Sequence, residues 1–286
     1  MAYKIREASI PILPPGSPDI RVLHFSDLHL TPRRKSEISD IKSFISLKPD
    51  LVISTGDFLA HRDAVPVVLD ALDELLNLPG LYVFGSNDYY EPSFKNPLKY
   101  LMKDDGTRKL GKELPWQELD YGLSQRGWKN VNTAKENLRI KGTLIEARGT
   151  DDAHLGRDNY SLVEGEANPD AQISIGITHA PYSRVLNSMA TDNLDLIFAG
   201  HTHGGQIRIP WVKESKALTT NCDLPLWRSR GVTKIENEPW LNVSAGMGTS
   251  PFARFRFACP PEVSIITLCS RSEEHTSELQ SLRHLV

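Results

Sequence analysis

The stretch DLIFAGHTHGGQIRIP, residues 195–210, contains the most informative pattern in this chain. Its apolar run, Leu196–Ala199, is typical of a short buried strand, and the run ends at Gly200. Two histidines, His201 and His203, follow with one residue between them. A strand that leads directly into metal-type ligands flanked by glycines predicts a binding site at its carboxyl end.

Four other apolar runs end in the same way. The runs at 20–25, 50–55, 81–84 and 172–178 are each followed by a loop that carries potential ligands. With the loop after residue 199, these loops supply Asp27, His29, Asp57, Asn87, His179, His201 and His203. Apolar residues at helical spacing separate the first three runs, which predicts parallel βαβ units. The carboxyl ends of such strands converge on one crevice, so the seven side chains are expected to meet there.

The types of these side chains indicate the kind of metal. Imidazole and carboxylate ligands together favour Zn, Fe, Mn or Ni over Ca or Mg. Seven ligands are more than one ion requires, so the set predicts two ions that share a carboxylate and keep positions open. A single Asp-x-His or Gly-Asp pair is common in loops, and only the joint pattern indicates a shared metal site.

Composition limits the classes of function. The chain has 286 residues and a formal net charge of −3, which gives no electrostatic reason to expect a nucleic-acid partner. Its three cysteines lack the spacing of a zinc site or a disulfide framework. No apolar run approaches the ~20 residues of a membrane-spanning helix, and residues 1–16 do not resemble a signal peptide. The chain as written is expected to be cytoplasmic, or exported or bound at a membrane surface if a segment precedes Met1.

One domain, residues 1–270, accounts for the chain, with strands also expected at 144–149 and 262–268. The segment 91–129 loses the strand and helix rhythm, and it is interpreted as an insertion with one helix around 97–102 that overhangs the site. Residues 271–286, RSEEHTSELQSLRHLV, resemble the translation of a sequencing-adapter oligonucleotide. They are interpreted as a non-native tail and excluded from functional reasoning.

The strings DLH, GD, GSND, ITHAP and GHTHGGQ occur in this order, and together they resemble the motifs of the calcineurin-like metallophosphoesterase family. The resemblance spans roughly residues 20–268 and is greatest to the bacterial branch whose last motif reads GHTHGGQ. It implies a four-layer α/β/β/α sandwich with two Mn, Fe or Zn ions, divalent or trivalent, at the carboxyl ends of the strands. By position, it implies a first metal held by Asp27, His29 and His203, a second held by Asn87, His179 and His201, and Asp57 as the bridge.

The function implied by the resemblance is that of a dinuclear phosphohydrolase, in which metal-bound hydroxide attacks a phosphoester or phosphoanhydride. The alternative is a catalytically weak metal-binding scaffold of the same fold that mediates protein contacts. The substrate would be a phosphorylated small molecule or a lipid-linked or cell-wall phospho-compound. The lipid-linked class predicts an apolar groove with a basic rim, formed partly by residues 91–129. The sequence does not separate monoester, diester and pyrophosphate, and it does not fix the oligomeric state.

The third motif departs from the family pattern. Many members have a histidine after the asparagine, and this chain has Asp88 there. An aspartate with an ordinary pKa of ~3.9 is a poor general acid near neutral pH. Asp88 is nevertheless the candidate catalytic residue: either its pKa is raised so that it serves as the acid, or it orients another acid, and turnover is retained. The alternative is that protonation of the leaving group is lost and the enzyme prefers a leaving group that needs no proton. Tyr89 and His154 are further candidates for substrate contact, although packing and an ordinary surface loop would equally explain them.

Overall fold

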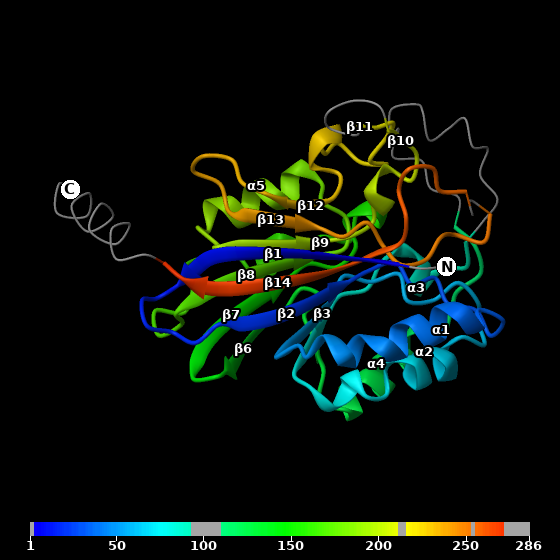
Figure 1. Cartoon of the computed structure of the whole chain (residues 1–286), viewed down its shortest axis with the longest axis horizontal. Helices are drawn as coiled ribbons and strands as arrows, with labels where there is room; N and C mark the ends of the chain where they lie inside the picture. Colours follow the sequence, from blue (N-terminus) through cyan, green and yellow to red (C-terminus); the bar gives the residue numbers. More distant parts are fainter. Residues whose placement is uncertain (1–2, 93–109, 211–215, 253–254, 272–286) are drawn as a thin grey trace.

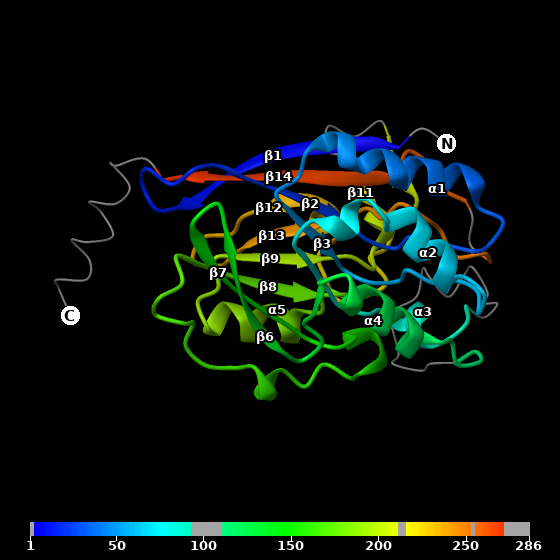
Figure 2. The ribbon, with the colours of Figure 1, turned by 90° about the horizontal axis from the view of Figure 1, so that it is seen from below.

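The structure is a computed structural model that describes residues 3–92, 110–210, 216–252 and 255–271. Two six-stranded sheets lie face to face, and helices cover the outer face of each sheet (Figures 1 and 2). The predicted four-layer α/β/β/α sandwich is confirmed. No helix among the described residues is long and apolar enough to span a membrane.

The first sheet has the strand order β1-β14-β2-β3-β4-β5. Strands β2 to β5 are parallel, and β14 pairs with β1 in parallel and with β2 in antiparallel orientation. The bounds are β1 (Lys4–Leu13), β2 (Ile20–Phe25), β3 (Leu51–Ser54), β4 (Gly80–Tyr82), β5 (Lys129–Asn130) and β14 (Glu262–Ser270). β1 was not predicted, because charged residues and Pro11 interrupt its apolar pattern. Proline is tolerated there because β1 is an edge strand.

The second sheet has the order β12-β13-β9-β8-β7-β6. Its four central strands are parallel, and an antiparallel strand closes each edge. The bounds are β6 (Lys135–Ile140), β7 (Thr143–Gly149), β8 (Ile173–Thr178), β9 (Leu196–Ala199), β12 (Gly231–Thr233) and β13 (Trp240–Val243). The strands predicted at 144–149, 172–178 and 196–199 are confirmed. A small antiparallel ribbon of β10 (Arg208–Ile209) and β11 (Lys216–Ala217) lies beyond β9.

Alternation along the strands separates the layers of the core. In β2, Val22 packs between the two sheets, whereas Leu23 and Phe25 pack under the helices. The helices are α1 (Lys35–Lys42), α2 (Val65–Leu72), α3 (Ser86–Tyr89), α4 (Trp116–Gln125) and α5 (Ser183–Thr191). Helices α1, α2 and α4 cover the first sheet, and α5 covers the second (Figure 2). Short 3-10 helices are η1 (Ser43–Leu47), η2 (Leu75–Asn77), η4 (Ala153–Leu155), η5 (Tyr160–Leu162), η6 (His203–Gly205) and η7 (Leu226–Arg228).

Part of the predicted insertion belongs to this framework. Within 91–129, α4 places Leu119 and Leu123 in the core under the first sheet, and β5 pairs with β4. The helix predicted around 97–102 lies outside the described residues. Of the predicted tail at 271–286, only Arg271 is described, where its backbone amide donates to Leu13 and its side chain to Asp195, and the rest also lies outside the described residues.

Candidate metal centre

The seven side chains predicted as metal ligands come from five loops at one end of the two sheets. Asp27 and His29 follow β2, Asp57 follows β3, Asn87 lies in α3 after β4, His179 follows β8, and His201 and His203 follow β9. The strands that precede them are parallel within each sheet, so their carboxyl ends bring these loops together as predicted.

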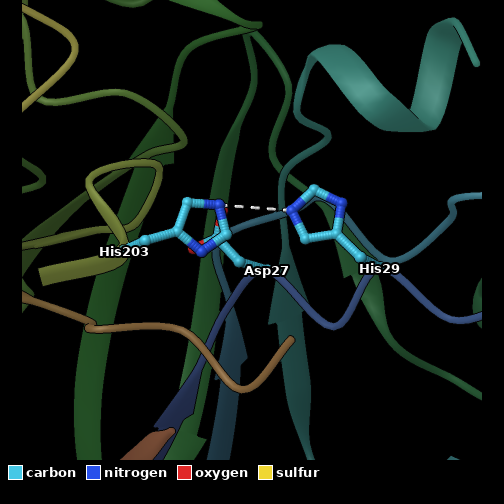
Figure 3. Close-up of side chains that lie close together, drawn as sticks. All are labelled: Asp27, His29 and His203. Carbon is cyan, nitrogen blue, oxygen red and sulfur yellow. Dashed lines mark hydrogen bonds and ion pairs between the residues drawn. The ribbon is translucent and has the colours of Figure 1, made fainter. Parts of the chain in front are cut away.

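Two groups of three ligands converge at this end. One is Asp27, His29 and His203, the other is Asp27, Asp57 and His179, and the ligand atoms within each group lie within 4.8 Å of one another. In the first group, Nε2 of His29 lies 3.3 Å from Nε2 of His203 (Figure 3). Oδ1 of Asp27 lies 3.6 Å from the same Nε2 of His203. The first group has the same members as the set predicted for the first metal.

Asp57 lies between imidazoles of both predicted sets. Its Oδ2 lies 3.5 Å from Nε2 of His29, and its Oδ1 lies 3.6 Å from Nε2 of His179. The same carboxylate accepts hydrogen bonds from the backbone and side-chain amides of Asn87, at 2.8 and 2.6 Å. A carboxylate whose two oxygens face different imidazoles has the arrangement that a bridging ligand requires, which is the role predicted for Asp57.

The unsatisfied atoms of the cluster show that the residues present fit a metal. Asp27, His29 and His179 are almost completely buried. Among the described residues, Oδ1 of Asp27 and Nε2 of His179 have no hydrogen-bond partner. Buried polar atoms are normally paired, because leaving them unpaired costs free energy. The two facing Nε2 atoms of His29 and His203 can share at most one proton between them. A cation among these atoms would satisfy all of them.

Burial and neighbouring charges also shift the pKa values in the cluster. Burial raises the pKa of Asp27 to about 6 and lowers that of His29 to about 4. Burial lowers the pKa of His179, but the nearby carboxylates of Asp57, Asp152 and Asp27 outweigh it and raise this pKa to about 9. Burial acts to raise the pKa of Asp57, but His179, His29 and the amides of Asn87 keep it below its ordinary value. The shifts of His179 and Asp57 show that the carboxylates favour positive charge beside them, whereas burial lowers the pKa of His29 and keeps its imidazole neutral, the form that binds a metal.

The backbone at the ligands is held in an unusual conformation. Five ligands have a positive φ, namely Asp27 (55°), His29 (44°), Asp57 (57°), His201 (66°) and His203 (48°). Residues other than glycine seldom adopt this left-handed region, which costs of order 1–3 kcal/mol for each residue. Such strain is found where a function requires the side chain to point in one direction.

Two glycines allow the ligand loops to approach each other. A Cβ atom at Gly85 would lie 2.3 Å from Oδ1 of Asp57 and 2.5 Å from the ring of His179. A Cβ atom at Gly200 would lie 1.9 Å from Oγ of Ser26. Any larger residue at either position would push the loops apart.

A pocket opens over the cluster. Its wall contains five of the seven predicted ligands, His29, Asp57, Asn87, His201 and His203, and also Ser86, Tyr90, His154, Gln206, Thr219 and Asn221. Donors and acceptors of this kind around a pocket can hold a phosphate group next to the cluster.

Asp88 lies beneath the pocket and does not line it. Its carboxylate accepts backbone hydrogen bonds from Asp57 and Gly85 at Oδ2, and from Phe58 and Leu59 at Oδ1, with distances of 2.7–3.1 Å. The side chain has no exposed surface. Burial beside Asp57 raises the pKa of Asp88 to about 8, and the amides of Gly85 and Leu59 act to lower it. A catalytic acid must touch the leaving group, and this position does not provide the contact that the predicted role requires.

Of the two residues predicted to contact substrate, Tyr89 packs in the core. Its ring contacts Phe84 and Trp116, and its hydroxyl donates a hydrogen bond to Asp151 at 2.7 Å. The next residue, Tyr90, lines the pocket instead, because α3 turns Tyr89 towards the core.

The other, His154, lies where a substrate can reach it. It lines the pocket from η4, and its ring centroid is 4.5 Å from that of His201. Its Nδ1 lies 3.1 Å from the hydroxyl of Tyr182, and its backbone amide donates to Asp152 at 2.9 Å. These contacts fix the orientation of the imidazole beside the cluster.

Three residues near the ligands were not predicted. Nε2 of His201 lies 3.2 Å from both the carbonyl oxygen and the side-chain nitrogen of Asn221. Nη2 of Arg256 lies 3.2 Å from Nδ1 of His203. Asp152 is fully buried, and burial raises its pKa to about 7. Asn221 and Arg256 lie in loops that show no pattern of a strand followed by ligands, so the sequence carried no signal for them. Asp152 follows β7, the strand predicted at 144–149, and the same strand-then-ligand pattern could have identified it.

Comparisons with known proteins agree with this geometry. Residues 20–205 match the model of a family described as calcineurin-like phosphoesterase. The uncharacterized metallophosphoesterase YkuE of Bacillus subtilis is 28% identical over 91% of this chain and 82% of its own length. The phosphodiesterase YaeI of Escherichia coli is 26% identical over 87% of this chain and 82% of its own length. The UDP-2,3-diacylglucosamine pyrophosphatase LpxG of Chlamydia trachomatis is 24% identical over 86% of this chain and 83% of its own length.

Proposed function

Because this chain belongs to the calcineurin-like phosphoesterase family, we propose that it hydrolyses a phosphoester or phosphoanhydride bond with the help of two bound metal ions. The observation that carries the proposal is the buried cluster of aspartates and histidines that opens on a polar pocket. Nitrogen and oxygen donors of this kind accept Mn, Fe and Zn. A phosphodiesterase and a pyrophosphatase among the relatives support both classes of bond.

The roles of the residues follow from their positions. One ion would be held by Asp27, His29 and His203, and the other by Asn87, His179 and His201. Asp57 would contact both ions. When bound, the ions would supply Lewis-acid charge and a hydroxide nucleophile for in-line displacement at phosphorus. The substrate would be a phosphorylated small molecule or a lipid-linked or cell-wall phospho-compound, with its phosphate in the pocket above the cluster.

The experiment that tests the proposal measures metal and hydrolysis on the same protein. We expect elemental analysis to find about two transition-metal ions per chain after growth with Mn, and chelation to remove them. Hydrolysis of a bis-aryl phosphodiester, an aryl monoester and a nucleoside diphosphate ester would then be followed with and without added Mn. At least one substrate should turn over, only with metal present, because no lysine or arginine is found among the described residues that line the pocket to replace the charge of the ions.

Two outcomes would contradict the proposal. Hydrolysis that survives complete removal of metal would exclude the assigned mechanism. Two bound ions without hydrolysis of any of the three substrates would favour the alternative, a metal-binding scaffold.

His154 is expected to bind the phosphate of the substrate. His154→Asn removes an imidazole that lines the pocket beside His201, and kcat/KM should fall about 10–100-fold. This range corresponds to the loss of one hydrogen bond to a charged group, about 1.5–3 kcal/mol. Steady-state kinetics at fixed metal concentration would measure the fall, and elemental analysis would confirm that both ions remain.

The matched control is His61→Asn, because the side chain of His61 is 46% exposed and does not line the pocket. Its kcat/KM should equal that of the wild type. If His154→Asn and His61→Asn behave alike, His154 has no role in substrate binding.

A further inference from the structure

The ribbon beside the pocket has an outer surface of unusual composition. Residues around β10 and β11 form three short extended segments, because Ile207 also pairs with Phe257 in a parallel bridge. The backbone amide of Leu218 donates to the carbonyl of Ile207 at 3.1 Å, so Ile207 lies between Leu218 and Phe257. Residues directly opposite each other in neighbouring strands point to the same side. These three apolar side chains therefore share one side of the ribbon.

The alternation along each segment identifies which side is exposed. Arg208 and Ala217 are paired with each other and are 5% and 2% exposed, so they face inward. The residues on the other side are exposed: Ile207 36%, Ile209 42%, Leu218 42%, Phe255 65% and Phe257 44%. A solvated ribbon normally has its polar residues outside and its apolar residues inside. In this ribbon most of the outward residues are apolar, and we name the five exposed apolar residues the apolar rim.

The inner side of the same ribbon contacts the metal centre. Nη1 of Arg208 donates to the carbonyl of Gly204, within the loop that carries His203, at 2.7 Å. Arg256, between the two phenylalanines of the apolar rim, lies against Nδ1 of His203. Gln206 and Thr219 line the pocket and are adjacent in sequence to Ile207 and Leu218. The apolar rim therefore lies at the mouth of the pocket.

The charge of these segments differs from that of the rest of the chain. Among the described residues of 201–221 and 244–261, Arg208, Lys216 and Arg256 are basic and none is acidic, and the two arginines face inward. Lys216 is exposed and pairs with Ile209, so it lies on the same side as the apolar rim. The two phenylalanines of the rim stack with their ring centroids 6.4 Å apart. Exposed aromatic and aliphatic side chains beside an exposed lysine, with no acidic residue among the described residues of these segments, match the chemistry of an anionic lipid surface.

We propose that the apolar rim is a docking surface for an anionic lipid bilayer. The exposed phenylalanines and isoleucines enter the boundary between headgroups and acyl chains, and Lys216 lies among the anionic headgroups. Docking in this orientation places the mouth of the pocket against the bilayer. The inference does not depend on the proposed hydrolysis, because binding to lipid is measured without a substrate.

The test is co-sedimentation of the full chain with vesicles of phosphatidylcholine alone or mixed in equal parts with phosphatidylglycerol. We expect the wild type to bind the mixed vesicles at least about tenfold more tightly, and the binding to weaken as salt is raised. Phe255→Ser with Phe257→Ser should weaken binding about tenfold for each substitution, because burial of each ring from water is lost. Lys216→Gln should weaken binding to the mixed vesicles about fivefold and leave binding to phosphatidylcholine unchanged.

Matched controls come from exposed apolar residues outside the apolar rim. Leu162 on η5 is 69% exposed and Tyr121 on α4 is 67% exposed. The variants Leu162→Ser and Tyr121→Ser should bind vesicles as the wild type does. The double phenylalanine variant should keep the wild-type melting temperature, because its side chains contribute little to the core. It should also hydrolyse a water-soluble aryl ester like the wild type.

Three results would overturn the proposal. The wild type could remain in the supernatant with both kinds of vesicle, or the double variant could sediment as the wild type does. Light scattering could instead show a wild-type dimer that becomes a monomer in the double variant, without vesicle binding, which would assign the apolar rim to contact between two copies. If vesicles bind but no phosphate compound is hydrolysed, the proposed function fails and the docking surface stands.

Discussion

Asp57→Ala is expected to lower hydrolysis at least about a thousandfold and to reduce the metal content from about two ions per chain to one or none. The carboxylate of Asp57 lies between His29 and His179, with one oxygen 3.5 Å from the first imidazole and the other 3.6 Å from the second. Removing it would therefore take a ligand from both of the proposed ions. It also leaves both amides of Asn87 without the acceptor that orients them.

The effect would be measured in three ways: turnover on the best substrate, elemental analysis, and the rise in melting temperature on addition of Mn. A ligand present at a thousand times its Kd stabilises the folded state by about 4 kcal/mol. In a domain of this size that corresponds to roughly 10 °C. The wild type should show a rise of this order, and Asp57→Ala should show almost none.

Two further variants, Asp57→Asn and Asp63→Ala, test whether the loss of metal and turnover comes from the charge of Asp57 itself. Asp57→Asn keeps the shape of the side chain but removes its negative charge, so it should lose metal nearly as completely as the alanine variant. The side chain of Asp63 is 71% exposed, and its replacement should change neither metal content nor turnover. An Asp57→Ala protein that retains two ions would show that Asp57 does not bridge them.

Asp88→Ala is expected to lower the free energy of unfolding by about 3–5 kcal/mol. Four backbone amides donate to this buried carboxylate, and all four would lose their acceptor in the interior. In a domain of this size the melting temperature should fall by roughly 10 °C or more. The melting temperature of Asp88→Asn should fall about half as far, because one side-chain oxygen can still accept hydrogen bonds from the amides of Phe58 and Leu59. Thermal unfolding would measure both, with Asp70→Ala as the control for an exposed carboxylate paired with Lys42.

The same variants distinguish a positioning role for Asp88 from the catalytic acid predicted from the sequence. One amide bound by Asp88 belongs to Asp57, so its loss would displace the bridging ligand and slow all substrates by a similar factor. Loss of an acid would slow alkyl phosphoesters far more than p-nitrophenyl phosphoesters, because only the poor leaving group needs a proton. We expect the uniform loss, with partial recovery in Asp88→Asn. A selective loss on alkyl substrates, at unchanged melting temperature, would restore the catalytic assignment.

The order of motifs along the chain was sufficient to predict the architecture. Apolar runs that end in ligands predicted five strands and their shared direction, and the structure confirms them as β2, β3, β4, β8 and β9. The physical reason is that parallel strands place their carboxyl ends at one edge, whatever the length of chain between them. The segment 91–129 was less well predicted. β5 has only two residues, too few to show a pattern, and α4 and β5 join the first layer through packing under the first sheet and pairing with β4.

The sequence alone was enough to predict which side chains gather at the candidate metal centre, because residue type and position after a strand are both local properties. It did not determine the direction of each neighbouring side chain. Asp88 and Tyr89 are adjacent to Asn87 in sequence, but the turn of α3 directs both away from the pocket, one to backbone amides and the other to aromatic rings. His154 lies far along the chain and is brought beside His201 by the pairing of β7, β8 and β9. The tertiary structure also decided which side of the β10–β11 ribbon is exposed, because that depends on what packs beneath it.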